Sequence, residues 1–192
     1  MPDPGPRIYL AGPEVYLPDA IAFGREKCRL ARAAGFTGVF PLDQSLDLTG
    51  LAKPEQARRI SLANEALMRT CDLLIANLTP FRGASMDAGT AFEVGFMRAL
   101  GCPVLGYTNT TPDYSVRAAA ARAGGIPAGD CDGPAIEIED FGLAENLMIA
   151  IAIEESGGTV VRTSVAPGAG MTALDGFGRC LDQARRIMAA RS

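Results

Sequence analysis

Short apolar runs alternate with longer amphipathic stretches along this chain, and that alternation limits its fold more than any other feature. The most continuous apolar run is 72–78, which is typical of a strand buried on both faces of a sheet. Repeated strand–helix–strand alternation is typical of a parallel sheet built from βαβ units. We therefore predict one α/β domain over 1–192, doubly wound in the flavodoxin-like or Rossmann-like manner, with a five-stranded, mainly parallel sheet.

The pattern also predicts where the elements lie. Strands are expected at 8–11, 36–40, 72–78 and 103–107, with a short fifth strand at Ile136 and Ile138. Helices are expected at about 18–34, 53–70, 86–100, 143–155 and 172–190. Residues 1–6 are predicted to be a flexible leader, and 159–170 fit neither pattern. The excursion 109–134 is too long for an ordinary connection, so a lid is a candidate role for it.

Composition excludes several classes of protein. Of the 192 residues 48% are hydrophobic and 21% are charged, which suits a globular core. The net charge of −4 argues against a protein that coats nucleic acid. No run approaches the roughly 20 apolar residues that span a bilayer, and the first residues lack the signal-peptide pattern. We expect a cytoplasmic protein that binds neither nucleic acid nor membrane.

The chain has no histidine, which removes Ser-His-Asp and Cys-His catalysis and histidine–zinc sites. Its five cysteines stand 29 to 49 residues apart, without a close metal-binding pair. Their odd number suits free thiols in a reducing cytosol. We expect no metal, and acid–base or nucleophilic chemistry falls to other side chains.

Open parallel sheets bind ligands beyond the carboxyl ends of their strands. Three segments are expected at that edge, namely 12–14, 41–44 and 79–87. Neither a phosphate loop of the form GxxxxGK[ST] nor a GxGxxG fingerprint occurs there. A nucleoside triphosphate or dinucleotide cofactor is therefore not indicated.

The segment 83–95 is the strongest candidate for a site. Asp87 can cap the predicted helix, and Gly89 and Gly95 cost about 1 kcal/mol each relative to alanine within it. Such glycines indicate that something approaches the backbone closely. Glu93 lies in an apolar run, so it is either the outward polar residue of an amphipathic helix or a buried acid.

Other polar candidates have plainer interpretations when taken singly. Asp72 can be a strand-edge residue, and Tyr9 a core residue whose hydroxyl finds one partner. Gln44 and Asn146 can be loop or helix-surface amides. Only their combination favours a functional site.

At these residues the sequence resembles the nucleoside 2-deoxyribosyltransferase family. The most specific match is the Asp-x-Gly-x-x-x-Glu-x-Gly block at 87–95. Weaker matches occur in the family's order at 8–13, 41–43, 71–78 and 146–148. The resemblance implies a homo-oligomeric enzyme without metal or cofactor.

The resemblance also implies roles for individual residues. Glu93 aligns with the nucleophile that attacks the anomeric carbon of deoxyribose, and Tyr9 with the tyrosine that orients it. Asp87 aligns with an aspartate near the departing base. The implied substrate-binding residues are Asp72, Gln44, Gly12, Pro13, Gly89 and Asn146. Asn146 is expected to serve the site of a neighbouring subunit.

The chemistry of the N-glycosidic bond agrees with these roles. Its cleavage passes through an oxocarbenium-like sugar, which a carboxylate below C1′ can stabilise and capture covalently. A protonated carboxyl near the base would assist departure, and Asp87 is the candidate. A second base then attacks from the opposite side and restores the original anomer. The expected partners are a deoxynucleoside and a free nucleobase.

One alternative is an N-glycosidic hydrolase of (deoxy)nucleosides or deoxynucleoside 5′-monophosphates that uses the same nucleophile. Against a phosphate, the first loop carries Pro13 and the acidic Glu14. In its favour, Arg82 and Ser85 precede a helix and could bind an anion.

A second alternative, from another class, is a non-catalytic nucleotide-sensing module on the same fold. Such a module would not need Glu93, Asp87 and Tyr9 together. Loss of turnover with retained deoxynucleoside binding in Glu93→Ala would support the enzyme.

Overall fold

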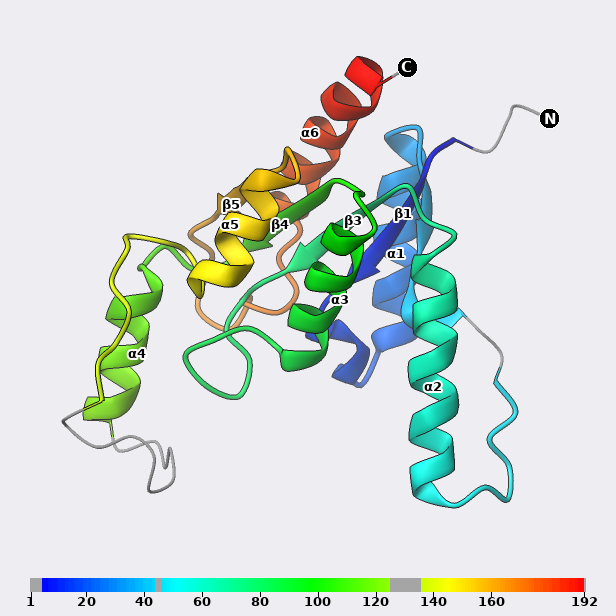
Figure 1. Cartoon of the computed structure of the whole chain (residues 1–192), viewed down its shortest axis with the longest axis horizontal. Coiled ribbons are helices and arrows are strands. Elements are labelled where there is room, and N and C mark those ends of the chain that lie inside the picture. Colours follow the sequence, from blue (N-terminus) through cyan, green and yellow to red (C-terminus); the bar gives the residue numbers. More distant parts are fainter. Residues whose placement is uncertain (1–4, 44–45, 125–135, 192) are drawn as a thin grey trace.

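The computed structural model describes residues 5–43, 46–124 and 136–191 and has a single five-stranded parallel sheet at its centre (Figure 1). Its strands are β1 Arg7–Ala11, β2 Thr37–Val39, β3 Leu73–Asn77, β4 Val104–Thr108 and β5 Val160–Arg162. Their spatial order is β2-β1-β3-β4-β5, and every neighbouring pair is parallel. This is the doubly wound order of flavodoxin-like sheets, so the predicted fold class is confirmed.

Helices cover both faces of the sheet. The helices that the structure describes are α1 Ala20–Ala33, α2 Lys53–Met68, α3 Ala88–Ala99, α4 Tyr114–Ala123, α5 Leu147–Glu155 and α6 Asp175–Arg191. Two short 3₁₀ helices, η1 Pro13–Tyr16 and η2 Pro41–Asp43, follow β1 and β2. No helix within the described ranges is long and apolar enough to cross a membrane.

Two hydrophobic clusters form the core, one on each face. Because side chains alternate along a strand, Ile8 packs on the face of α1 and α6, while Tyr9 packs on the other. The Tyr9 face is covered by α2, α3 and α5 through Met68, Val94 and Ile153. All five residues of β3 are buried, as its continuous apolar run predicts.

The fifth strand was predicted at the wrong place. Ile136 and Ile138 lie outside regular structure, and Ile136 is exposed. The edge strand is β5, in the segment that fitted neither pattern, where Val160 pairs with Gly106 of β4. A parallel strand needs a crossover that packs on the sheet. Helix α5 provides it, whereas α4 lies away from the sheet (Figure 1).

Two other segments differ from expectation. The excursion 109–134, which was the candidate lid, contains α4, and its residues 125–134 lie outside the described residues. At the predicted leader, the carbonyl of Pro6 accepts a hydrogen bond from the Thr37 amide, so residue 6 is tied to the sheet. Residues 1–4 of that leader lie outside the described part of the chain.

Candidate active site

A pocket of about 360 Å³ opens between α2 and α3, on the sheet face that holds Tyr9. Its volume falls within the range of small-molecule sites. The lining residues are Ala57, Ile60, Ser61, Asn64, Met68, Gly89, Phe92 and Glu93. Two of the predicted site residues, Gly89 and Glu93, therefore border one cavity.

Glu93 lies on the inner side of α3. The buried residues Thr90, Val94 and Met97 define the face that this helix turns toward the sheet, and Glu93 adjoins it. The hydroxyl of Tyr9, a fully buried residue of β1, donates a hydrogen bond to Glu93 Oε1 at 2.7 Å. Glu93 is thus not the outward polar residue of an amphipathic helix.

The environment of Glu93 suits a carboxyl that changes ionisation near neutral pH. Burial raises the pKa of Glu93 to about 7; the Tyr9 hydrogen bond lowers it, and the negative charge of Asp87 raises it. Burial and the charge of Glu93 hold the pKa of Tyr9 well above its ordinary value. Tyr9 therefore stays protonated and acts as a donor, which leaves the carboxylate oriented but chemically available.

Asp87 is the N-cap of α3. Its Oδ2 accepts hydrogen bonds from the amide and the hydroxyl of Thr90, at 2.9 and 3.1 Å. Its Oδ1 makes no hydrogen bond among the described residues, so one oxygen stays open to a ligand. Gly89 is the second residue of α3, and a Cβ at this position would lie 3.0 Å from Asp87 Oδ2. Glycine thus leaves room beside the cap at the mouth of the pocket.

Gly12 and Pro13 end β1 at the carboxyl edge of the sheet and are buried outside the pocket lining. A Cβ at Gly12 would lie 1.8 Å from Glu14 Oε2 and 2.9 Å from the Asn77 Cβ. No larger residue fits there, so close packing beneath the loop explains this glycine. Substrate contact remains a prediction for both residues.

Glu14 does not face the site as its sequence position suggested. It is fully buried, and its Oε1 accepts hydrogen bonds from Lys27, Asn77 and Tyr107 at 2.9, 3.1 and 2.9 Å. Lys27 is equally buried, so the two charges form an internal ion pair. The expectation that Glu14 repels a phosphate is therefore wrong, because its charge is neutralised inside the protein.

Two predicted residues that the structure describes, Asp72 and Asn146, do not line this pocket. Asp72 is exposed at the amino end of β3, where its carboxylate accepts a hydrogen bond from the Arg7 amide at 2.7 Å. This is the strand-edge role, at the end of the sheet opposite the site. Asn146 caps α5, and its side-chain amide donates to Glu139 Oε2 at 2.8 Å. Gln44 lies outside the described residues.

Two polar residues of the pocket were missed. Ser61 and Asn64 lie on the wall formed by α2, opposite Glu93. A helix was expected over 53–70, but no role was predicted for these two side chains. The spacing of Ala57, Ser61, Asn64 and Met68, at three and four residues, marks this side and could have been recognised.

The raised pKa of Glu93 makes a prediction about stability. Its folded pKa of about 7 exceeds the ordinary 4.5, so ionisation costs stability increasingly between these values and fully above pH 7. Glu93→Gln is expected to raise the free energy of unfolding by about 3 kcal/mol at pH 8. The gain should shrink toward pH 5. Urea denaturation of both proteins at the two pH values measures it.

Glu26→Gln is the control for this experiment, because Glu26 is an exposed carboxylate on α1. It should change stability little at either pH. A Glu93→Gln protein no more stable than the parent at pH 8 would contradict a carboxyl that is costly to ionise.

Comparison with known proteins identifies the family. The family model described as nucleoside 2-deoxyribosyltransferase matches residues 8–148. An uncharacterized protein of Schizosaccharomyces pombe is 33% identical over 171 residues, which cover 81% of this chain and 80% of that protein. A solved 2-deoxyribosyltransferase from Leishmania mexicana is 30% identical, with a TM-score of 0.59 over 75% of this chain and 85% of its own. A conserved protein from Enterococcus faecalis V583, 18% identical, shares the fold with a TM-score of 0.54 over 94% and 99%. The chain belongs to the nucleoside 2-deoxyribosyltransferase family.

Proposed function

We propose that this protein transfers 2-deoxyribose between nucleobases and that Glu93 carries the sugar as a covalent intermediate. One observation supports this most strongly: the Glu93 carboxyl borders a pocket of about 360 Å³ while Tyr9 holds one of its oxygens. Membership of the family and the likeness to the Leishmania mexicana enzyme support the same reaction.

In the first half-reaction, the proton of the Asp87–Glu93 pair lies on Asp87, and an ionised Glu93 oxygen bonds to C1′ of the deoxynucleoside. The bond from C1′ to the base nitrogen breaks, its electron pair stays with the base, and Asp87 supplies the proton. In the second half-reaction, the nitrogen of an incoming base bonds to C1′, its proton passes to Asp87, and the bond to Glu93 breaks. Two inversions at C1′ give net retention.

Tyr9 has a positioning part in this scheme. Its hydroxyl occupies Oε1 of Glu93 and leaves Oε2 without a hydrogen bond among the described residues. The free oxygen is then the one that bonds to carbon. Because Tyr9 is fully buried in the sheet, its hydroxyl holds the carboxylate in a fixed position at the border of the pocket.

The pocket wall offers the groups that a nucleobase needs. The Asn64 amide can donate to and accept from the edge of a base, and the Ser61 hydroxyl can do either. Phe92, which is 55% exposed, offers a ring for stacking. The scheme uses no metal or cofactor. We also expect a cytoplasmic location; the four described cysteines are free thiols.

Hydrolysis of a nucleoside or of a 5′-monophosphate remains a second candidate because of two observations. The charge of Glu14 is buried against Lys27 and does not oppose a phosphate. Arg82 is exposed beside the rings of Tyr16 and Phe81 and pairs with no carboxylate among the described residues. A free cation near the carboxyl edge of the sheet would tolerate a phosphorylated donor.

Product analysis tests the proposal. Incubation of deoxyinosine with free adenine is expected to give deoxyadenosine, detected by chromatography. Glu93→Gln should lower the rate by roughly three orders of magnitude, as loss of a nucleophile does in other covalent enzymes. Glu26→Gln, on the other face of the sheet, should leave the rate unchanged.

Other outcomes point elsewhere. If free deoxyribose forms equally with and without adenine, the protein is a hydrolase and not a transferase. Turnover only of a 5′-monophosphate donor would assign a phosphorylated substrate. Binding of deoxynucleosides without any turnover would favour a sensing module.

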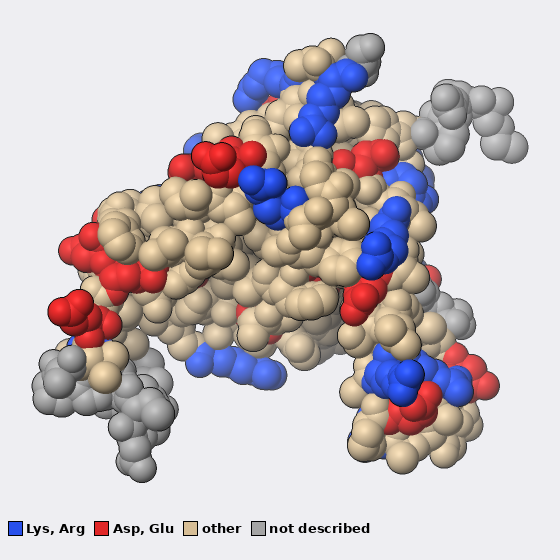
Figure 2. All heavy atoms as spheres, in the orientation of Figure 1, with Lys and Arg blue, Asp and Glu red and all other residues tan. Residues whose placement is uncertain are grey.

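We also infer that a second copy of the chain covers the face formed by α2, α3 and α5. That face exposes Ile60, Phe92, Met148 and Ile151. In Figure 2 the surface over α3 and the start of α5 is mostly uncharged. An apolar area of this kind usually marks an interface. A copy placed here would bring its own Asn146 toward the neighbouring pocket, as the family resemblance implies.

Met148→Lys tests this inference. Met148 is 70% exposed on α5, and a charge there should break an apolar interface and yield monomers in sedimentation experiments. Val116→Lys is the matched control, since Val116 is 57% exposed on α4. A parent protein that is monomeric, or a Met148→Lys protein of unchanged mass, would contradict the interface.

A further inference from the structure

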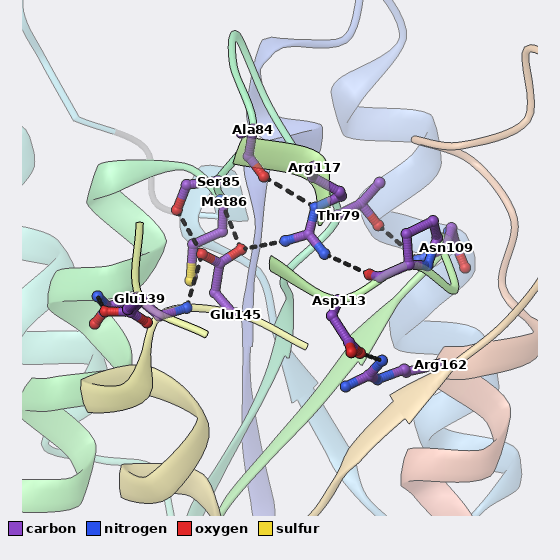
Figure 3. Close-up of polar contacts among 12 residues, drawn as sticks. Thr79, Ala84, Ser85, Met86, Asn109, Asp113, Arg117, Glu139, Glu145 and Arg162 are labelled. Atoms are coloured by element: carbon purple, nitrogen blue, oxygen red, sulfur yellow. Dashed lines mark hydrogen bonds and ion pairs between the residues drawn. The ribbon is translucent and has the colours of Figure 1, made fainter. Parts of the chain in front are cut away.

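A buried carboxylate outside the pocket collects an unusual number of hydrogen bonds. Glu145, just before α5, is fully buried and accepts four of them (Figure 3). Its Oε1 accepts from Ser85 Oγ at 2.6 Å and from the Asn146 amide at 3.0 Å. Its Oε2 accepts from the Met86 amide and from Arg117 Nη2, both at 3.1 Å. All four acceptor positions of the carboxylate are therefore used.

Arg117 is the charged partner of the Glu145 carboxylate. This residue of α4 has a side chain that is only 9% exposed, and it forms an ion pair with Glu145. Its Nε donates to the Ala84 carbonyl at 3.0 Å, and its Nη1 donates to Pro112 at 2.8 Å. Three consecutive residues, 84–86, are thus held by one ion pair, which we call the Glu145–Arg117 clamp.

The residues that the clamp holds directly precede the proposed catalytic residues in the sequence. The clamp itself does not line the pocket. Met86, whose amide it binds, is followed directly by Asp87, the N-cap of α3. Glu93 lies six residues after Asp87 on that helix. The same carboxylate binds the amide of Asn146, the N-cap of α5. One side chain therefore fixes the starts of both helices relative to each other.

We propose that Glu145 is a positioning residue: with Arg117 it clamps 84–86 and so holds Asp87 beside Glu93 for sugar transfer. This inference rests on the proposed function. Stability alone is a poor reason for the arrangement, because a buried ion pair often contributes no more than apolar side chains of the same volume. Its value lies in fixed geometry, since small misplacements of catalytic groups cost large factors in rate.

Glutamine cannot replace this glutamate, although the two have almost the same shape. A side-chain NH₂ in place of Oε2 would face the Met86 amide and Arg117. In place of Oε1 it would face the Asn146 amide. Either orientation sets a donor against a donor, so the clamp loses its hold on 84–86.

Arg162→Gln is the matched control. Arg162 forms an ion pair with Asp113 and donates to the carbonyls of Thr111 and Gly142, so it also anchors the chain beside α4 and ahead of α5. It makes no hydrogen bond to 84–86 (Figure 3). Its loss should loosen the surroundings of the clamp while the clamp itself remains.

The experiment measures transfer kinetics and the titration of Glu93 in both variants. Glu145→Gln is expected to lower kcat by about 10- to 100-fold with KM changed by less than about threefold, whereas Arg162→Gln should change neither. The charge of Asp87 raises the pKa of Glu93, so an Asp87 that moves away should lower that pKa from about 7. Carbon-13 NMR of the Glu93 carboxyl reports this shift directly.

An unchanged kcat and an unchanged Glu93 titration in Glu145→Gln would overturn the proposal. Equal changes in Arg162→Gln would also overturn it, because they would reflect general loosening. If Glu145→Gln does not fold, Ser85→Ala decides; it removes one donor and should lower kcat by about 3- to 10-fold with a lower Glu93 pKa. A parent protein without transfer activity refutes the proposed function alone, and the NMR titration still tests the clamp.

Discussion

The hydrogen bond between Tyr9 and Glu93 is the contact on which the proposed activity depends. It joins the third position of a central strand to the middle of α3, across 84 residues of sequence. Burial makes the carboxyl costly to ionise and raises its pKa to about 7. A buried carboxyl that is costly to ionise lowers the stability of the fold. A role in the reaction therefore explains its presence best.

Several features keep this contact in place. Tyr9 is fully buried in the sheet, and its neighbour β3 is buried along its whole length, so the donor has little freedom to move. Beneath the carboxyl edge, the internal pair of Glu14 and Lys27 fills the space under the first loop. Above it, Asp87 caps α3, and the clamp holds the residues before the cap. The cap and the clamp thus hold the start of the helix that carries the acceptor.

Most of the fold follows from local pattern, whereas its edges do not. Continuous apolar runs predict the inner strands, because a strand that is buried on both faces is apolar at nearly every position. The edge strand β5 has three residues, and its position depends on where α5 returns the chain. No pattern local to Ile136 and Ile138 could reveal that the helix before them does not pack on the sheet.

The site was partly accessible from the sequence for similar reasons. The spacing of Asp87, Gly89 and Glu93 within one helix marks them, but the tyrosine partner came from family resemblance. Sequence alone did not tell that Asp72 lies at the opposite end of its strand or that Glu14 turns inward to a lysine. The role of Glu145 could not be predicted from the sequence, because its partners lie 28 to 60 positions away, apart from the adjacent Asn146 amide.

The most direct test of the account is a search for the covalent intermediate. A 2-fluoro-arabinosyl nucleoside slows the second half-reaction, so the sugar should accumulate on the enzyme. We expect the intact protein to gain the mass of one fluorinated sugar, with the label on Glu93 after peptide mapping. An active protein whose Glu93 remains unmodified, or a label on another residue, would contradict the central claim.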